Sequence, residues 1–483
     1  MIPILTAAEV RSAERAVMAT LPDGTLMERA ATAIAVECFS LFRQHGGIVG
    51  RQVLLLVGSG DNGGDALYAG VRLLDRGVTV HALPLGTSMH AEGTAAFMRA
   101  GGRVVDTVHA LELFGDIDLV IDGIVGLGSS RSLDGDAALI ARALDDAEIF
   151  TLAIDVPSGV HTDTGAIPGV AIGADVTITF GALRPAQVIP PAAVHCGDVL
   201  IADIGIDVSS PNMVVTDQGN WFAPPAADAD KYARGVVGVV TGSDQYPGAA
   251  LLSVASALHS GCGMVRFFGP HDDLVVQAYP EVVPAARSAI DASHRTQAWV
   301  VGCGLGTDDD AAAALLAVLA KDAPVVVDAD ALTIMSMRPV VREALQARAG
   351  KVTVLTPHAG EAARLGSGYG LQLDLINDRL GAARALATAT KAIVLLKGPS
   401  TLITDGGHYL ATPLLGSQLA TAGSGDVLAG LIGGALARWS ARTPIGVDAA
   451  MELAAAAAIR HAAAAEPEDT TASDLVEGLQ QMW

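Results

Sequence analysis

The segment Leu419–Gly434 of this 483-residue chain, Leu-Ala-Thr-Ala-Gly-Ser-Gly-Asp-Val-Leu-Ala-Gly-Leu-Ile-Gly-Gly, is the feature that most restricts its fold. Small residues run directly into an apolar stretch with helical spacing, which predicts a tight loop that opens a helix at about Asp426. Free backbone N–H groups at a helix start favour negative charge, so the loop is a candidate anion site. Asp426 lies at its mouth, where a carboxylate can take the proton of a hydroxyl group attacking a phosphoryl group. Taken alone, Ser424 or Asp426 would more often be a helix cap, and only matching chemistry in other loops favours a site.

Composition indicates a large globular protein and excludes some partners. Hydrophobic residues make up 51% of the chain and charged residues 17%, and the length suggests two or three domains. The net charge of -22 and a pI near 4.8 argue against non-specific binding to nucleic acid or anionic membranes. A nucleotide ligand must therefore be held by local amides or single cations.

Cysteine spacing and hydropathy indicate a cytoplasmic protein. The four cysteines, Cys38, Cys196, Cys262 and Cys303, have neither metal-type spacing nor a disulfide framework and fit a reducing compartment. The chain start has no signal-peptide pattern, and no apolar run approaches the roughly 20 residues that span a bilayer.

The first half begins with a predicted βαβ unit. We expect a buried strand at Gln52–Val57, a glycine-rich loop at Gly58–Asp65, a helix at Ala66–Arg76 and a strand at Val78–Leu83. The loop matches Gly-x-Gly-x-x-Gly, but the second strand ends without an acid for a ribose hydroxyl. Its two aspartates would also repel a pyrophosphate, so a cation or a polar ligand edge fits better than an ordinary dinucleotide.

Two further predicted strands of this half also end in aspartate. Ile117–Ile121 leads to Asp122, and Phe150–Ile154 leads to Asp155. The carboxyl ends of parallel strands meet at one crevice, where α/β proteins bind ligands. A single strand-terminal aspartate is more often a cap or a turn former. Together with the aspartates of the Gly58–Asp65 loop, however, three strand ends of this half carry glycine-flanked aspartates, which favours a site.

In the second half, polar groups follow predicted strands at Ala298–Val301, Val325–Val327, Val352–Leu355 and Ile393–Leu396. Lys397 suits a phosphate contact, although most lysines in such a position are surface residues. His358, between Pro357 and Gly360, would alone more often be a turn or core histidine, but its position favours exposure at the sheet edge. The carboxylates of Asp328, Asp330 and Glu361 could help to hold magnesium through water, and a helix cap is an equal alternative for Asp330.

Gly58–Asp65, Asp122–Gly128 and Asp155–Gly159 resemble the N-terminal epimerase domain of the bifunctional NAD(P)H-hydrate repair enzymes, over roughly residues 4–207. The resemblance implies that Asn62, Asp122 and Ser158 bind potassium and that Asp155 is catalytic. The residues implied in substrate binding are Asp61, Asn62, Gly63, Gly64, Asp65, Gly126, Leu127, Gly128, Ser129, Ser130, Arg131, Ser132 and Asp155. The chain departs from the family pattern at Asp61, where asparagine is usual, and at Ala66, where glycine is usual.

Lys231–Gly235, Gly242–Gly248, Thr356–Glu361, Lys397–Thr401 and Ala420–Gly430 resemble the C-terminal dehydratase domain of the same family, which has a ribokinase-like fold. Ala249, Gly304, His358 and Asp426 are then implied in substrate binding, with Asp426 catalytic. Lys397, Gly398, Pro399, Ser400, Thr401 and Gly425 are implied in nucleotide binding. Cys303 stands where proline is commoner, and Ser424 where threonine is frequent.

These resemblances predict two α/β domains. Residues 1–210 would form a Rossmann-like three-layer αβα epimerase domain, and residues 226–483 a ribokinase-like dehydratase domain. We expect the first to interconvert R and S forms of NADHX and NADPHX, and the second to dehydrate the S form with ADP by phosphorylation and elimination. We also expect the first domain to bind potassium, the second to use magnesium, and the protein to form a homo-oligomer. The alternatives are an ordinary ribokinase-like kinase for a vitamin precursor or sugar, and a first half that only binds a ligand or acts as a scaffold.

Overall fold

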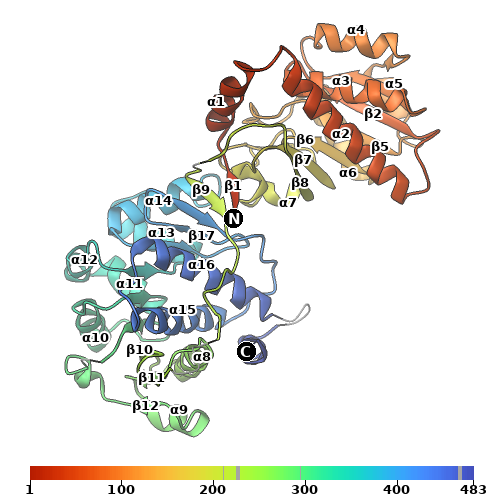
Figure 1. The fold of residues 1–483 in the computed structure, drawn as a ribbon. Helices are drawn as coiled ribbons and strands as arrows, with labels where there is room; N and C mark the ends of the chain where they lie inside the picture. Colours follow the sequence, from red (N-terminus) through yellow and green to blue (C-terminus); the bar gives the residue numbers. More distant parts are fainter. Residues whose placement is uncertain (210, 225–228, 294, 466–469, 483) are drawn as a thin grey trace. The chain divides into compact units, whose positions relative to one another are not determined.

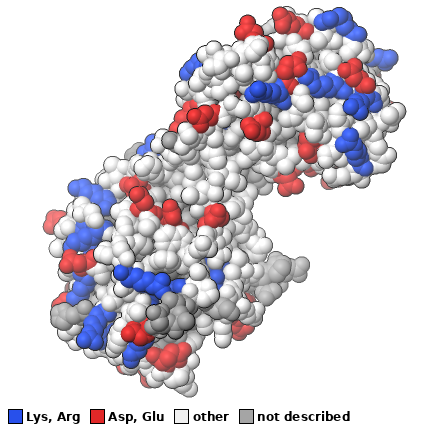
Figure 2. Space-filling view, viewed as in Figure 1, with Lys and Arg blue, Asp and Glu red and all other residues white. Residues whose placement is uncertain are grey.

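In a computed structural model, which describes residues 1–209, 211–224, 229–293, 295–465 and 470–482, the chain forms two compact α/β units (Figure 1). The first is built from Ile2–Asn212, and the second mainly from Met213–Leu375 and Arg379–Trp483. Within the described parts, no helix has both the length and the apolar character needed to cross a membrane. In the view of Figure 2, acidic and basic side chains are interspersed on each unit.

The first unit contains a seven-stranded parallel sheet in the order β4-β3-β2-β5-β6-β7-β8. The strands of this sheet are β2 (Gln52–Val57), β3 (Thr79–Pro84), β4 (Arg103–Val104), β5 (Leu119–Gly123), β6 (Thr151–Ile154), β7 (Val176–Phe180) and β8 (Asp198–Ala202), and β1 (Ile2–Ile4) lies outside it. The helices of the unit are α1 (Ala7–Met18), α2 (Thr25–Gln44), α3 (Asp61–Leu74), α4 (Ala91–Arg99), α5 (Thr107–Glu112), α6 (Gly135–Ala147) and α7 (Ala192–His195). A short 3₁₀ turn covers Pro185–Gln187.

Alternation along β2 explains the three layers of this unit. Leu55 and Val57 pack with Ile34 of α2 and other apolar residues of α2 and α3 on one face of the sheet. Leu54 and Leu56 face the other way, toward α5 and α6. Strand order reverses between β2 and β5, and ligands of parallel α/β sheets bind at such a point beyond the carboxyl ends of the strands.

The second unit contains a mostly parallel sheet in the order β9-β18-β17-β16-β15-β14-β13-β10-β11-β12, in which β17 is antiparallel to both neighbours. The strands are β9 (Met213–Val215), β10 (Val236–Val240), β11 (Met264–Phe267), β12 (Val283–Pro284), β13 (Ala298–Val301), β14 (Val325–Val327), β15 (Thr353–Leu355), β16 (Ile393–Leu396), β17 (Leu402–Thr404) and β18 (Tyr409–Ala411). The helices are α8 (Pro247–Leu258), α9 (Asp272–Ala278), α10 (Asp309–Leu319), α11 (Asp330–Met337), α12 (Pro339–Gln346), α13 (Ala359–Gly368), α14 (Arg379–Thr390), α15 (Ser424–Ser440), α16 (Val447–Ala463) and α17 (Ala472–Gln481).

Glycines place α15 close to both the sheet and α8. A Cβ at Gly433 would lie 2.0 Å from a methyl carbon of Val300 on β13, and one at Gly430 would lie 2.1 Å from the carbonyl oxygen of Ser253 on α8. Any larger residue would force α15 away from its neighbours. The glycines thus fix the position of the amino end of α15, where Asp426 lies.

The predicted strands of both halves are confirmed to within about two residues, and α15 begins at Ser424, close to the predicted start. The predicted helix Ala66–Arg76 is wrong at its start, because α3 begins at Asp61 and takes in most of the expected loop. A Cβ at Gly63 would lie only 2.2 Å from the carbonyl oxygen of Gly58, so glycine here permits an abrupt strand-to-helix turn.

Candidate active sites

A cavity of about 590 Å³ lies beyond the carboxyl ends of β2 and β5 in the first unit. Of the residues predicted for the first site, Asp61, Asn62, Asp65, Gly126, Leu127, Gly128 and Asp155 line it. Gly63 and Gly64 do not, because they are buried in the first turns of α3, where Gly64 packs against Met27. The convergence of three separate loops on one cavity supports the sequence prediction of a site here.

The loop after β5 lines the cavity with residues 124–128, whereas Ser129 and Ser132 make hydrogen bonds to the backbone of other segments. Ser129 is buried, and its hydroxyl accepts a hydrogen bond from the backbone N–H of Gly159 at 3.3 Å. The hydroxyl of Ser132 accepts one from Val170 N–H at 2.8 Å. Ser130 and Arg131 are exposed and outside the cavity lining. Substrate contacts by residues 129–132 therefore stay a prediction.

Of the three residues predicted to bind potassium, Asn62 lines this cavity, whereas Asp122 and Ser158 are buried outside its lining and contact each other. A carboxylate oxygen of the fully buried Asp122 accepts a hydrogen bond from the Ser158 hydroxyl at 2.7 Å, and the other accepts from Ser158 N–H at 2.7 Å. The amide of Asn62 donates to Ile154 O at 2.8 Å and packs so tightly on Gly126 that a Cβ there would lie 2.3 Å from Asn62 Oδ1.

These residues fit a monovalent cation. Burial raises the pKa of Asp122 to about 6, although hydrogen bonds from Ser158 and Ile124 oppose the shift. Among the described residues no ion pair involves Asp122. A buried carboxylate surrounded by hydroxyl and amide oxygens offers only hard ligands, and one formal charge is too few for a tight divalent site.

Asp155 is held by residues that the sequence patterns did not identify. Arg184 Nη2 lies 2.9 Å from Asp155 Oδ1, and both side chains are almost completely buried. The Thr179 hydroxyl donates to the same oxygen at 3.2 Å, and the Gln187 amide donates to the Asp155 carbonyl at 2.5 Å. Asp155 has a left-handed φ of 67°, a conformation that costs energy outside glycine and that is often retained at functional sites. Arg184 lies just after β7, and the sequence at the end of this strand has no motif that would have identified it.

A second cavity, of about 660 Å³, lies at the start of α15 in the second unit. Of the residues predicted for the second site, His358, Lys397, Gly398, Pro399, Thr401, Gly425 and Asp426 line it. Ser400 does not, because it is buried and its hydroxyl donates to Thr412 O at 3.0 Å. Ends of β15 and β16 and the start of α15 thus meet as the sequence predicted.

Lys397 and two carboxylates form a charged cluster at this cavity. Lys397 Nζ lies 2.8 Å from Asp328 Oδ1 and 3.8 Å from Glu361 Oε2. A Cβ at Gly425 would lie 3.1 Å from Lys397 Nζ, so the ammonium group is directly beside the first turn of α15. Burial alone would lower the pKa of Lys397, but Asp328 and Glu361 raise it above its usual value. Lys397 is therefore a fixed positive charge at the helix start.

The carboxyl group of Asp426, in the first turn of the same helix, has a raised pKa. Burial raises its pKa to about 7, the negative charge of Asp328 acts in the same direction, and Cys303 and Lys397 oppose them. A carboxylate with a pKa close to neutral is suited to general base catalysis. Cys303, the departure from the family pattern, is thus a buried neighbour of the carboxylates.

The carboxylates proposed to hold magnesium do not converge on a single point. Asp328 pairs with Lys397, Glu361 accepts His358 N–H at 2.8 Å, and Asp330 accepts Gly306 N–H at 2.9 Å. Direct coordination by the three together does not fit this arrangement. Magnesium held largely by water and nucleotide phosphates does fit, since this ion retains several waters in protein sites.

Ala249 and Gly304 lie together at the start of α8 but outside the lining of the second cavity. Gly304 has a φ of +58°, and a Cβ there would lie 2.7 Å from the Cβ of Ala249. They flank the point between β10 and β13 where strand order reverses. Substrate contact by either residue stays a prediction.

His461 of α16 lines the second cavity and was not singled out from the sequence. Burial lowers its pKa to about 4, with Lys397 acting in the same direction, so the ring is neutral at physiological pH. Its Nε2 lies 3.4 Å from the hydroxyl of Ser424, the first residue of α15. An alanine-rich helix gives no local pattern that would identify one buried histidine as part of a site.

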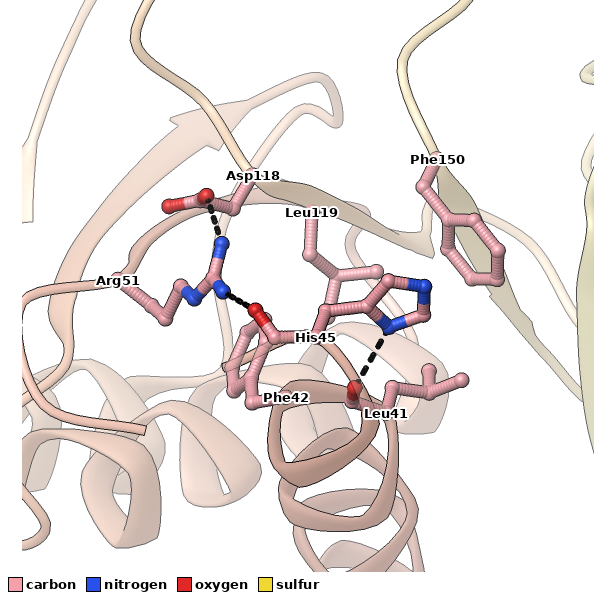
Figure 3. Close-up of a pocket in the computed structure, with 7 residues that line it drawn as sticks. All are labelled: Leu41, Phe42, His45, Arg51, Asp118, Leu119 and Phe150. Carbon is pink, nitrogen blue, oxygen red and sulfur yellow. Dashed lines mark hydrogen bonds and ion pairs between the residues drawn. The ribbon is translucent and has the colours of Figure 1, made fainter. Parts of the chain in front are cut away.

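A third cavity, of about 150 Å³, lies at the opposite end of the first sheet (Figure 3). It is beside Arg51 and Phe150, which precede β2 and β6, far along the strands from Asp155. Its polar groups already have partners: Arg51 binds Asp118 at 2.6 Å, and His45 Nδ1 contacts Leu41 O at 2.9 Å. This cavity is therefore not an alternative active site.

Comparisons with known proteins agree with the two-unit arrangement. Residues 237–480 match the family described as NAD(P)H-hydrate dehydratase, and residues 23–186 match the YjeF-related protein N-terminus family. The chain is 46% identical to the bifunctional NAD(P)H-hydrate repair enzyme Nnr of Mycobacterium tuberculosis over 435 residues, which cover 89% of this chain and 88% of that protein. It is 43% identical to the protein of the same name from Mycobacterium leprae over 437 residues, again 89% and 88% of the two chains.

Among solved structures, the ADP/ATP-dependent NAD(P)H-hydrate dehydratase from Bacillus subtilis is 25% identical, with a TM-score of 0.46, and covers 57% of this chain and 99% of its own. The sequence relatives span both units at high identity. This chain belongs to the family of bifunctional NAD(P)H-hydrate repair enzymes.

Proposed function

We propose that the chain carries out both reactions named for its family, one in each unit. The first unit interconverts the R and S epimers of hydrated NADH and NADPH, and the second dehydrates the S epimer at the expense of ADP. The observation that carries this proposal is the cluster at the amino end of α15, where Asp426 and the ammonium group of Lys397 flank Gly425. It joins a base, a fixed cation and free helix N–H groups in one cavity.

In the second unit, Asp426 takes the proton of the substrate hydroxyl group while the hydroxyl oxygen attacks the terminal phosphorus of the nucleotide. The bond to the bridging oxygen breaks, and AMP leaves when the donor is ADP. The amide groups at the start of α15 and the charge of Lys397 stabilise the transferring phosphoryl group.

Phosphorylation is useful because hydroxide is a poor leaving group and phosphate is a good one. The carbon–oxygen bond of the phosphate ester then breaks, phosphate leaves with the electron pair, a proton is lost from the adjacent carbon, and the carbon–carbon double bond of the dihydronicotinamide ring returns. Magnesium, bound through water and the nucleotide phosphates, would neutralise phosphate charge when present. Asp328 and Glu361 hold Lys397 in place for this step.

In the first unit, Asn62, Asp122 and Ser158 would hold potassium, which would supply a fixed positive charge beside the substrate. Asp155 carries out proton transfer at the oxygen bonded to the carbon being inverted. Its buried pair with Arg184 and the hydrogen bond from Thr179 fix the direction of its carboxylate. A reacting group held in this way loses little freedom when substrate binds.

We also propose that the protein works in the cytoplasm and as a homo-oligomer. All four cysteines are buried and unpaired, which fits a reducing compartment. Light scattering of the purified protein tests the oligomeric state.

The proposed function is tested by incubating mixed R,S-NADHX with the protein and ADP, ATP or no nucleotide. We expect complete conversion to NADH with ADP, and only interconversion of epimers without nucleotide. A stable phosphorylated product in place of NADH would favour an ordinary kinase. Persistence of the R epimer at its spontaneous rate of conversion would favour a first unit that only binds.

A further inference from the structure

Asp65 of α3 lies at the junction of two cavities of the first unit. One is the 590 Å³ cavity that contains Asp155, and the other is an adjoining cavity of about 540 Å³ beside Tyr68 and His90. Only 7% of Asp65 is exposed, and its Oδ1 is completely buried without a hydrogen-bond partner. A buried carboxyl oxygen without a partner is costly to fold around, which makes a purely structural role a poor explanation.

The groups that face Asp65 are carboxylates. Asp61 lies on its own helix, Glu14 comes from α1, and Asp155 follows β6, and each acts on the charge of Asp65. Three arginines also line the cavity: Arg184 is bound to Asp155 at 2.9 Å, and Arg11 and Arg15 come from α1. Burial first, and then repulsion from these three acids, raises the pKa of Asp65 well above its usual value.

Four carboxyl groups line this cavity, and two of them, Asp155 and Asp65, differ sharply in their partners. Asp155 Oδ1 has an arginine partner and a hydroxyl donor, and its Oδ2 is buried without a partner. Asp65 has neither, and the charges that act on it most are those of Asp61, Asp155 and Glu14. Two carboxyl groups with such different partners suit the separate roles of acid and base.

We propose that Asp65 is the proton donor for the hydroxyl group of the substrate during epimerisation, and that Asp155 is the matching proton acceptor. This assignment rests on the proposed epimerase activity and gives Asp65 a catalytic role beyond contact with substrate. The geometry that carries it is the partnerless carboxyl group of Asp65 in the cavity that also contains the Arg184-bound Asp155.

The reaction balances with these two groups alone. Water adds to an enamine with its oxygen on the carbon bonded to nitrogen, so the hydroxyl carbon of the hydrate is next to the ring nitrogen. Asp65 gives its proton to the hydroxyl oxygen, the carbon–oxygen bond breaks, and its electron pair leaves with water while the nitrogen lone pair forms a carbon–nitrogen double bond. Water then adds to the opposite face, the electrons return to nitrogen, and Asp155 takes the proton that the added water releases. Proton exchange with solvent returns both groups to their starting forms.

The test compares wild-type protein, Asp65→Asn and Asp65→Glu on purified R-NADHX, with the conversion to S-NADHX followed by chromatography. The Asn variant keeps the size of the side chain but cannot donate a carboxyl proton. We expect its kcat for epimerisation to fall by about 10²–10⁴-fold with KM unchanged, and Glu to recover part of the loss. Glu92→Gln is the matched control, because Glu92 is an exposed acid at the adjoining cavity and is outside the Asp155 cavity.

A pH profile separates proton donation from a structural role. The wild-type rate should fall on the alkaline side as Asp65 loses its proton, and this fall should be absent from the residual activity of Asp65→Asn. Dehydration of S-NADHX by the same variant should match wild type, which shows that the protein is folded. A wild-type kcat in Asp65→Asn, or a raised KM with unchanged kcat, would overturn the assignment. Wild-type protein that dehydrates the S epimer but leaves R-NADHX at its spontaneous rate would overturn the epimerase activity itself.

Discussion

The ammonium group of Lys397 lies 2.8 Å from Asp328 Oδ1 and directly beside Gly425 at the start of α15. The lysine therefore has two roles that one substitution will remove together. Lys397→Ala should raise the half-saturating ADP concentration for dehydration, because the phosphates lose a fixed cation. It should also lower thermal stability, since breaking a buried ion pair costs about 3–5 kcal/mol. Initial rates against ADP concentration and a thermal melt measure the two effects.

Lys351→Ala is the control for this substitution, because Lys351 pairs with Asp322 at 2.7 Å on an exposed surface. Such exposed pairs add little to stability because solvent screens them, so both measurements should match wild type. An ADP dependence of Lys397→Ala that is the same as wild type would show that Lys397 has no part in nucleotide binding.

Asp426→Asn should remove dehydration while epimerisation continues. Loss of a general base costs about 10²–10⁴-fold in turnover, and Asp426 belongs to a cavity formed by the second unit alone. NADH formation from S-NADHX and ADP measures the first effect, and the R-to-S ratio without nucleotide measures the second. Near-normal NADH formation by the folded variant would refute the assignment of Asp426 as the base.

The pH dependence of dehydration should follow the ionisation of Asp426. Burial and the charge of Asp328 raise its pKa to about 7, and a base works only when it is deprotonated. Turnover should therefore be low in mildly acidic solution, rise as the pH passes through about 7, and level off above it. A kcat that stays constant across this range, at saturating ADP and substrate, would contradict a role for Asp426 as the base.

Gly126→Ala tests the potassium site without removing a ligand. An added Cβ would lie 2.3 Å from Asn62 Oδ1, so the amide must move. We expect epimerisation to weaken and to need more potassium, and replacing potassium with lithium should weaken it in the wild type as well. Gly128→Ala is the matched control, because it lines the same cavity and its new Cβ would have no contact closer than 3.9 Å. Equal potassium dependence in both variants would argue against the site.

Much of the fold, and many of the residues that line the two candidate cavities, could be predicted because the signals are local. Strand-terminal residues such as Asp155 in the first half and Lys397 in the second follow hydrophobic runs directly, and parallel topology then places each at the candidate cavity of its own unit. Asp426 was found in the same way, from small residues that lead into a helical pattern.

The missing parts depend on contacts between distant segments. Arg184 binds Asp155 from 29 positions along the chain, and His461 reaches Ser424 from 37 positions away. No spacing rule connects such pairs. The start of α3 was misplaced for a related reason: the glycines of Gly58–Gly64 suggested a loop, whereas Gly63 is there to let the helix begin against the backbone of Gly58. Helix and turn propensities describe single residues and could not show the close approach of Gly63 to the backbone of Gly58.

The most direct test of the two-site account is complementation between two variants that are each deficient in one reaction. Asp155→Ala and Asp426→Asn are incubated separately and together with mixed R,S-NADHX and ADP, and each epimer is followed by chromatography. Asp155→Ala alone should consume the S epimer and leave the R epimer apart from slow spontaneous conversion, and Asp426→Asn alone should interconvert the epimers without forming NADH. The mixture should convert both epimers to NADH. If Asp155→Ala alone clears R-NADHX at the wild-type rate, or if the mixture leaves R-NADHX unconsumed, the division of the two reactions between these sites is wrong.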